Sequence, residues 1–346
     1  MKILMVPRSH KYARELKRYL QQAKVQVVSL QPFHYAAPIN IINLILCRIS
    51  GYKIIHVHWL YSFPFGFIMK AFCFFCRFLQ IKIVWEMHNI VPHDGNEAER
   101  ALSRWFYERV DAVIFHSQDD VARSKKLLLS SVEKKHIVIP HGNFHQAYQN
   151  TLSKKEARDI LNIPMTRRVI LCFGILRNYR GYEYLIEATK DMAGVDVLVV
   201  GQKHDKDVYT ELLNDQKQMP HLRIITGWIP DNEVQIYFNA SDIVVLPYTE
   251  ITTSGVTLLA YAFSRPVIST HVGGMKEVVN EKIGMLVPPR DGKALKSAID
   301  TMFTMDYDAL GKNAREYAEK ECSWEANTQK IKALYESLLE MPDVIE

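Results

Sequence analysis

Short runs of β-branched and apolar residues recur along this chain, and a helix-length segment separates most of them from the next. The alternation is typical of parallel sheets, because a crossover must carry the chain back before the next parallel strand can pair. The runs of the first half are 2–6, 25–30, 54–59, 81–87, 111–117 and 136–140. Those of the second half are 168–174, 195–201, 222–228, 242–248 and 265–270. The sequence therefore predicts an α/β protein with two doubly wound sheets.

The domain boundaries follow from the length and from one break in the pattern. A chain of 346 residues suits two domains. Residues 145–166 are polar and carry no strand pattern, so we expect the linker there, between an N-terminal domain over 1–150 and a second domain over 160–322. Residues 323–346 begin with a plausible helix N-cap, Ser323, and continue with amphipathic spacing. Ligands of doubly wound sheets bind at the carboxyl ends of the strands, so we expect the site in a cleft between the domains.

The charge of the chain is concentrated at its N-terminal end. Residues 1–80 hold eleven Lys or Arg and a single acid, Glu15, for a net charge of +10. The whole chain carries only +5, so the other 266 residues sum to −5. This asymmetry indicates an anionic partner for the N-terminal domain, either nucleic acid or a membrane surface. Five cysteines and the lack of a secretory signal in the first residues favour a reducing cytoplasm.

A phenylalanine-rich run lies inside this basic region. It reads YSFPFGFIMKAFCFFCRFL over residues 61–79 and contains Lys70 and Arg77, so it is poorly suited to crossing a membrane. Two interpretations remain open: an interfacial segment lying on anionic lipid, or a buried helix that is rich in Phe. Cys73 and Cys76 have no second CxxC pair, and we interpret them as small apolar residues. The Phe residues do not alternate with basic ones as nucleic-acid stacking platforms do.

Two loops of the second domain have the chemistry of an anion site. The first, after strand 168–173, runs from Gly174 to Gly181 and carries Arg177 and Arg180, which can clamp a phosphate group. By contrast, the first strand of the chain runs into Pro7-Arg8-Ser9-His10 without a glycine, which disfavours a dinucleotide-dependent dehydrogenase.

The second loop follows strand 242–248. Thr253, Ser254 and Gly255 precede an apolar helical stretch, where free backbone amides and hydroxyls suit an anion. Glu250 in the same loop suits hydrogen bonds to sugar hydroxyls, and the alternative is a solvated loop acid.

These motifs together resemble GT-B glycosyltransferases, above all family 4 and its relatives, over nearly the whole chain. The donor-domain motifs are Phe173-Gly174, Arg177, Tyr179-Arg180-Gly181, Leu246-Pro247-Tyr248, Ser254-Gly255, Arg265-Pro266-Val267-Ile268, Val272-Gly273-Gly274, Glu277-Val278-Val279 and Gly284. The remaining motifs are His56-Val57-His58-Trp59, His88-Asn89, Asp111-Ala112-Val113, Ser117, Ile139-Pro140-His141-Gly142 and Ser323-Trp324.

The resemblance implies two Rossmann-like domains facing across a cleft, with a C-terminal helix that can cross back to the N-terminal domain. It also implies sugar transfer from a nucleotide-diphosphate donor, UDP- or GDP-linked, without a metal or other cofactor. Arg177 and Arg180 would neutralise the diphosphate, Ser254 and Gly255 would donate to the phosphates, and Gly227 and Trp228 would lie near the base. Gly174 and Thr253 are also expected to bind the donor.

The catalytic residues are less clear, because the chain departs from the family pattern. Many retaining members carry two glutamates eight positions apart, but these positions are Leu259 and Ile251 here, with Glu250 adjacent. Retention or inversion of the anomeric configuration therefore stays open.

The expected catalytic residues are His88, Glu250 and Glu86. The resemblance favours His88 near the donor sugar, and Glu86, His93 and Asp94 are candidates for a base. Arg8, His56, His58 and His93 are expected on the acceptor side. A metal site could be drawn from the four histidines 56, 58, 88 and 93, but acceptor binding suits these strand ends better and no metal is expected.

We therefore expect a cytoplasmic glycosyltransferase that is peripherally bound to the inner face of the membrane. Its acceptor would be a lipid-linked saccharide or a glycolipid in polysaccharide or glycan assembly, and nucleic acid is not an expected partner. Two alternatives on the same scaffold remain: a nucleotide-sugar epimerase, and a non-catalytic module that binds a nucleotide sugar.

Overall fold

The computed structural model describes residues 1–6, 10–30, 37–60, 66–90, 97–129, 132 and 134–340. The chain forms two compact units. Unit 1 contains Met1–Gly142 and Ser323–Glu346, and unit 2 contains Asn143–Cys322. The chain therefore passes between the units twice, and its C-terminal segment belongs with its N-terminal half, as the resemblance implied.

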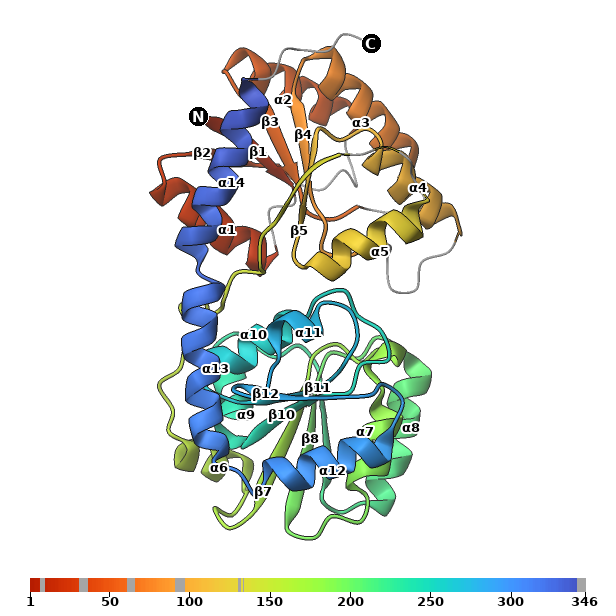
Figure 1. The fold of residues 1–346 in the computed structure, drawn as a ribbon, viewed down its shortest axis with the longest axis vertical. Helices are drawn as coiled ribbons and strands as arrows, with labels where there is room; N and C mark the ends of the chain where they lie inside the picture. Colours follow the sequence, from red (N-terminus) through yellow and green to blue (C-terminus); the bar gives the residue numbers. More distant parts are fainter. Residues whose placement is uncertain are drawn as a thin grey trace. The chain divides into compact units, whose positions relative to one another are not determined.

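Unit 1 is built on a six-stranded sheet in which every pairing is parallel. Its strand order is β2-β1-β3-β4-β5-β6 (Figure 1). The strands are β1 (Lys2–Val6), β2 (Gln26–Ser29), β3 (Ile54–Val57), β4 (Lys82–Glu86), β5 (Ala112–Phe115) and β6 (Lys135–Val138). The helices are α1 (Lys11–Gln22), α2 (Ala37–Ile49), α3 (Gly66–Phe78), α4 (Glu97–Tyr107), α5 (Gln118–Leu128) and α14 (Trp324–Leu339).

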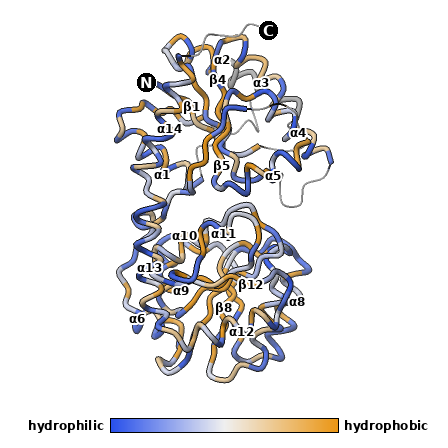
Figure 2. Tube along the Cα trace, viewed as in Figure 1, coloured by the Kyte–Doolittle hydropathy of each residue, from blue (hydrophilic) through white to orange (hydrophobic). Residues whose placement is uncertain are grey.

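Unit 2 repeats the plan, with the strand order β12-β11-β10-β7-β8-β9 and parallel pairing throughout. Its strands are β7 (Arg168–Phe173), β8 (Val195–Gly201), β9 (Leu222–Thr226), β10 (Ile243–Leu246), β11 (Val267–Thr270) and β12 (Gly284–Val287). Its helices are α6 (Lys154–Leu161), α7 (Tyr182–Thr189), α8 (Lys206–Gln218), α9 (Val234–Ala240), α10 (Gly255–Ala262), α11 (Met275–Val278), α12 (Gly292–Met302) and α13 (Tyr307–Glu321), with one 3-10 turn, η1 (Asn178–Arg180). The central strands are hydrophobic along their length, as Figure 2 shows, because helices cover both faces of such a sheet.

The polar stretch expected as a linker is part of unit 2. Ser153 and Glu156 form a capping box that begins α6, and the helix buries Arg158. The Arg158 guanidinium pairs with the Asp242 carboxylate at 2.9 Å and donates to the Ala240 carbonyl at 2.9 Å. The expectation of a linker over 145–166 was therefore wrong. The helix α6 is short and is anchored by a buried ion pair, so it lacks the long apolar run from which a core helix can be recognised in a sequence.

The phenylalanine-rich run forms α3 from Gly66 onward, while 61–65 lie outside the described residues. One face of α3 packs into the core through Met69, Phe72, Cys73 and Cys76. Both cysteines are free and buried in this core, in agreement with their interpretation as small apolar residues. Phe74 and Phe78 instead point to solvent, with exposed fractions of 65% and 75%. The interpretation of a buried helix therefore describes one face of α3, while the other face is exposed and its contact with lipid stays a prediction. Among the described helices, none is both long enough and apolar enough to cross a membrane.

The C-terminal helix α14 is bound to unit 1 by Trp324. This indole is buried and stacks on the Tyr19 ring, with centroids 5.9 Å apart. It also leaves no room for a side chain at position 142, where a Cβ atom would lie 2.3 Å from the indole. Three residues on, the Asn327 amide donates to the Pro140 carbonyl at 2.7 Å. The last helix is therefore part of the core of unit 1.

Truncating this anchor should destabilise unit 1. We expect Trp324→Ala to lower the free energy of unfolding by about 3–5 kcal/mol, the usual cost of truncating a buried aromatic side chain. Urea denaturation followed by circular dichroism measures the change. Gln329→Ala, at an exposed position of the same helix, is the control and should stay within about 0.5 kcal/mol of wild type. A loss under about 1 kcal/mol for Trp324→Ala would contradict the assignment.

Candidate functional site

Two loops meet where the strand order of unit 2 reverses, between β7 and β10. In doubly wound sheets ligands bind at this point, outside the carboxyl ends of the strands. The loops after β7 and β10 are held together by the Thr249 amide, which donates to the Tyr179 carbonyl at 2.8 Å. Gly181 has φ +67°, and a Cβ atom there would lie 2.1 Å from the Pro247 carbonyl oxygen. This close approach of two backbones requires glycine.

Arg180 is the central cation of these loops. Its side chain is buried, its Nη1 donates to the Phe173 carbonyl at 2.8 Å, and its guanidinium lies 5.5 Å from the centre of the Tyr248 ring. Gly174, at φ +125°, makes room for it, since a Cβ atom there would lie 2.4 Å from Nη2.

Nothing acidic neutralises this cation in the described part of the chain, and its Nε has no hydrogen-bond partner there. Burial disfavours the charged form, but the phenols of Tyr248, Tyr182 and Tyr179 raise the pKa of Arg180 above its ordinary value. A buried and unneutralised guanidinium at strand ends is suited to bind an anion.

The other residues predicted on these loops differ in how exposed their side chains are. Arg177 lies nearer the surface, with its Nη2 3.1 Å from the His204 Nε2. Ser254 is buried, and its hydroxyl is 2.9 Å from the Tyr248 hydroxyl. It precedes Gly255, the first residue of α10, and Thr253 is half-buried beside it. Glu250 belongs to the same loop and is exposed.

Gly227 and Trp228 lie outside the two loops that surround Arg180. They follow β9, which lies two strands from β7, and the Trp228 side chain is 76% exposed. Leu259 and Ile251, at the family's glutamate positions, are buried in the hydrophobic core of unit 2. Buried apolar side chains therefore occupy the positions at which many retaining members of the family that the sequence resembles carry glutamates.

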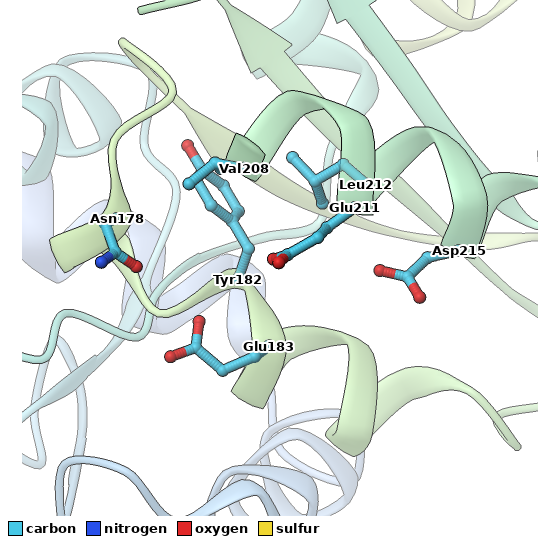
Figure 3. A pocket seen from close by; sticks show the side chains of 7 residues that line it. All are labelled: Asn178, Tyr182, Glu183, Val208, Glu211, Leu212 and Asp215. Carbon is cyan, nitrogen blue, oxygen red and sulfur yellow. The ribbon is translucent and has the colours of Figure 1, made fainter. Parts of the chain in front are cut away.

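A small hollow lies elsewhere in unit 2, between the start of α7 and α8 (Figure 3). Its lining includes the carboxylates of Glu183, Glu211 and Asp215 together with Tyr182 and Leu212. Burial raises the pKa of Glu183, and burial with the nearby Glu211 raises that of Asp215. Three acids repel a diphosphate, so this hollow does not suit the phosphates of a donor.

Unit 1 contains a cluster of buried polar side chains at its own strand ends. Glu86 ends β4, His56 lies in β3, and His58, His88 and His116 follow β3, β4 and β5. Glu86 and His56 are 0% exposed, His58 1%, His116 5% and His88 8%. We call these five residues the His/Glu cluster.

Short contacts join the members of the His/Glu cluster. Glu86 Oε2 lies 2.8 Å from His58 Nδ1 and 3.2 Å from His56 Nε2. His88 Nε2 is 3.4 Å from His58 Nδ1, and His88 Nδ1 is 3.1 Å from His116 Nε2. Tyr12 of α1 donates a short hydrogen bond to Glu86 Oε1. Two three-residue sets can offer ligand atoms to one metal ion: His56 with His58 and Glu86, and Glu86 with His88 and His116.

Electrostatics keep the carboxylate of this cluster charged and some imidazoles neutral. Burial by itself would raise the pKa of Glu86, but the adjoining His58 and His56 outweigh it and lower the pKa well below its ordinary value. Burial, followed by the nearby His56, lowers the pKa of His58 to about 4. Burial and His116 lower the pKa of His88 strongly.

The sequence identified only part of this cluster. Its candidates His56, His58, Glu86 and His88 do come together, whereas Arg8, His93 and Asp94 lie outside the described residues. The full burial of Glu86, His56 and His58 leaves only His88 with some exposure to a substrate. Tyr12, His116 and Tyr335 were missed. His116 could have been found from its position at a strand end, but no local signal marks the two tyrosines.

Comparison with known proteins shows which family the second half of the chain resembles. The model of the family described as "Glycosyl transferases group 1" matches residues 167–305, which contain the loops around Arg180. Over these residues the chain is similar to the group 1 glycosyl transferases. The chain also has the GT-B fold: a sucrose-phosphate synthase from Thermosynechococcus elongatus superposes with a TM-score of 0.80 at 20% identity, covering 98% of both chains. Anabaena HepE in complex with UDP-glucose has a TM-score of 0.75 at 18% identity and covers 97% of this chain and 100% of its own. These findings confirm the resemblance and the fold class stated from the sequence.

Two relatives of the chain are named as glycosyltransferases with a stated donor or acceptor. A D-inositol 3-phosphate glycosyltransferase of Corynebacterium urealyticum is 26% identical over 266 residues, which is 72% of this chain and 62% of the relative. A GDP-mannose:glycolipid 4-beta-D-mannosyltransferase of Xanthomonas campestris is 24% identical over 234 residues, 64% of this chain and 62% of the relative. The match thus spans about three fifths of the length of these relatives.

Acid should destabilise unit 1 through His141, beside the His/Glu cluster. Burial, followed by the nearby His116, lowers the pKa of His141 from 6.5 to about 3. Between these values the unfolded chain binds a proton that the folded imidazole does not, so stability is full above pH 6.5 and falls as the pH drops toward 3. Each such group contributes at most about 1.4 kcal/mol per pH unit.

We expect His141→Gln to reduce this slope by up to one proton, measured as the unfolding free energy at a series of pH values. His136→Gln, at an exposed position of β6, is the matched control and should leave the slope unchanged. An equal slope in His141→Gln and wild type would contradict the assignment.

Proposed function

We propose that this chain is a glycosyltransferase that moves a sugar from a nucleotide-diphosphate donor to a lipid-linked saccharide or glycolipid in glycan or polysaccharide assembly. The observation that carries the proposal is the buried guanidinium of Arg180 at the β7/β10 switch point, without an acidic partner among the described residues. The match of residues 167–305 to the group 1 glycosyl transferases supports it. The UDP-glucose complex of HepE and the GDP-mannose relative support a nucleotide-sugar donor of either base.

The chemistry follows from the charges of these loops. When the bond from the anomeric carbon to the diphosphate breaks, negative charge grows on the departing oxygen. Arg180 and Arg177 would stabilise that charge, which is the main electrostatic task of the transition state. The Ser254 hydroxyl and the first amides of α10 would donate to the phosphates. Two fixed guanidiniums make a metal unnecessary for this step.

The roles of the remaining candidate residues are proposed from how exposed their side chains are. Glu250 is exposed on the loop that holds Ser254 and would accept hydrogen bonds from sugar hydroxyls. His88 is the most exposed member of the His/Glu cluster and would contact a sugar hydroxyl. Glu86 is fully buried, so any effect that it has on the reaction would pass through the histidines next to it.

Removing the buried cation should weaken donor binding. We expect Arg180→Ala to lose about 10- to 100-fold in affinity for the matching nucleoside diphosphate, since a hydrogen bond to a charged group contributes about 1.5–3 kcal/mol. Arg177→Ala should lose less, because its side chain is more exposed. Isothermal titration calorimetry with UDP and GDP measures both. Lys293→Ala, exposed on α12, is the control. Undiminished binding in both arginine variants would remove them from the site.

Turnover separates the three candidate functions. Release of nucleoside diphosphate from a UDP- or GDP-sugar only when membrane lipid extract is present supports transfer. A changed sugar without any acceptor would indicate an epimerase. Binding without release, over a panel of donors and extracts, would indicate a non-catalytic module and contradict the enzyme proposal.

We also propose that unit 1 lies on the inner, cytoplasmic surface of an anionic membrane. Support comes from α2 and α3, which pack on each other and expose apolar side chains. The exposed fractions are 57% at Ile42, 55% at Leu46, 78% at Ile49, 65% at Phe74 and 75% at Phe78. Arg48, Lys53, Lys70 and Arg77 lie on or next to the same two helices. Apolar residues bordered by cations are typical of interfacial helices.

Vesicle binding tests this location. The protein should sediment with vesicles that contain phosphatidylglycerol and much less with neutral phosphatidylcholine vesicles, and salt should weaken the binding. Replacing Phe74 and Phe78 by Ser should reduce sedimentation several-fold, because both side chains are exposed and would lose their insertion into the lipid. Replacing the exposed Leu129 and Ile160 by Ser is the control. Equal binding to both vesicle types, or to neither, would contradict the proposal.

A further inference from the structure

We propose that His204 and Asp205, in the loop after β8, hold the guanidinium of Arg177 in the position from which it meets the diphosphate of the donor. Both residues act through Arg177 rather than on the donor itself, so they are positioning residues. The inference rests on the proposed function, because it gives a supporting role at the same phosphate-binding loop to two residues that the sequence did not single out.

The sheet of unit 2 brings the two loops together. β7 and β8 are neighbouring parallel strands, so the loops that follow them leave the same edge of the sheet. Beyond the strand ends the backbones continue side by side, since Leu176 pairs with Lys203 in a parallel bridge and the Asp205 amide donates to the Leu176 carbonyl at 3.1 Å. This register sets the next residues of the two loops, Arg177 and His204, beside each other.

The carboxylate of Asp205 is turned toward this pair. Asp205 is the N-cap residue of α8, yet its side chain accepts no hydrogen bond from the first turn of that helix, as a capping aspartate ordinarily does. Instead, Oδ1 lies 2.7 Å from His204 Nδ1, and Oδ2 accepts from the Asn178 amide at 2.9 Å. The hydrogen bond from His204, more than that from Asn178, lowers the pKa of Asp205 below its ordinary value. The carboxylate is therefore ionised at neutral pH and serves the loop after β7.

The directions of the hydrogen bonds fix the tautomer of His204. An ionised carboxylate can only accept, so His204 Nδ1 carries the hydrogen. In the neutral imidazole Nε2 then has a lone pair, and it lies 3.1 Å from Arg177 Nη2, which can only donate. The three side chains thus form one chain, in which Arg177 donates to His204 and His204 donates to Asp205. The negative charge at its end polarises the imidazole and makes it a stronger acceptor for the guanidinium.

Arg177 differs from Arg180 in what holds its side chain. Arg180 is buried and bonded to a backbone carbonyl, whereas Arg177 is only half-buried, just before the turn η1. A long side chain near the surface loses rotamer freedom when it binds an anion, and this loss weakens the binding. A guanidinium that the imidazole already holds has lost part of that freedom before the donor arrives. Charge fixed in this way stabilises the negative charge that develops on a departing phosphate.

The tautomer of His204 tests the geometry in the absence of nucleotide. In nitrogen NMR spectra of the histidine side chains at weakly basic pH, where imidazoles are neutral, we expect a hydrogen on Nδ1 of His204 and none on Nε2. The signal is assigned by its absence from the spectrum of His204→Gln. A hydrogen on Nε2 in the wild-type protein would overturn the proposal, because Arg177 could not donate to that nitrogen.

Nucleotide affinity tests the role. In calorimetry with UDP and GDP, His204→Ala should bind about 2- to 10-fold more weakly than wild type, as expected for one lost hydrogen bond, and should lose no more than Arg177→Ala. His204→Gln should stay close to wild type, because its amide oxygen can accept from Arg177 in place of Nε2. His136→Ala, at an exposed histidine of β6 in unit 1, is the matched control. Wild-type affinity in His204→Ala, or an equal loss in His204→Gln, would overturn the proposal.

A double variant separates positioning from direct contact with the nucleotide. Once Arg177 is replaced by Ala, the further change His204→Ala should alter the affinity less than about 1.5-fold, because the side chain through which His204 acts is gone. An equal loss in both backgrounds would mean that His204 acts by itself or through the fold, and would overturn the proposal. If the wild type bound neither UDP nor GDP, the proposed function would fail and this role with it. If Arg180→Ala weakens binding and His204→Ala does not, only the role of His204 and Asp205 fails.

Discussion

The reversal of strand order in each sheet is the constraint on which the candidate sites depend. Parallel strands bring all their carboxyl ends to one edge, and where the order reverses the two adjacent loops lead to helices on opposite faces of the sheet. In unit 2 the reversal lies between β7 and β10, and in unit 1 between β1 and β3. Loops that diverge in this way leave space outside the strand ends. In unit 2 the loops around Arg180 lie at this point, whereas the His/Glu cluster of unit 1 lies at the ends of β3, β4 and β5, beginning at the strand next to the reversal.

The two units use this edge in different ways. Unit 2 places a buried cation there and surrounds it with phenols and backbone, so that the charge is held without being neutralised. Unit 1 places a buried carboxylate there and surrounds it with imidazoles. The charge of Arg180 is held by backbone and phenols, and the charge of Glu86 is held by Tyr12 and by imidazoles. The same topology thus carries buried groups of opposite charge in the two units.

Stability and site geometry are linked through the C-terminal helix of unit 1. Trp324 packs against Tyr12 and Tyr19, and Tyr335 reaches the His56 imidazole from the same helix. Tyr12 in turn donates to Glu86. Loss of α14 would therefore remove both apolar packing and the Tyr335 hydroxyl that contacts His56 of the His/Glu cluster. This explains why a segment distant in sequence is part of the same compact unit as the first strand.

Much of the fold could be predicted from the sequence, because the spacing of apolar residues and the residues that favour turns are local properties of a chain. The strand runs, the Arg177–Arg180 loop and the Ser254–Gly255 turn all lie where the pattern predicted them. The short edge strand β12 and the short helix α6 were missed, since neither has a long apolar run.

Tertiary structure alone decided what surrounds each charge. The sequence determined that Arg180 follows a strand and that Glu86 ends one. It did not determine that Arg180 has no carboxylate beside it among the described residues, or that Tyr12 and Tyr335 contact Glu86 and His56. Residues that contact each other can be as far as 279 positions apart in the chain, as His56 and Tyr335 are. Burial and charge pairing are properties of packed surfaces, and no local pattern of residues contains them.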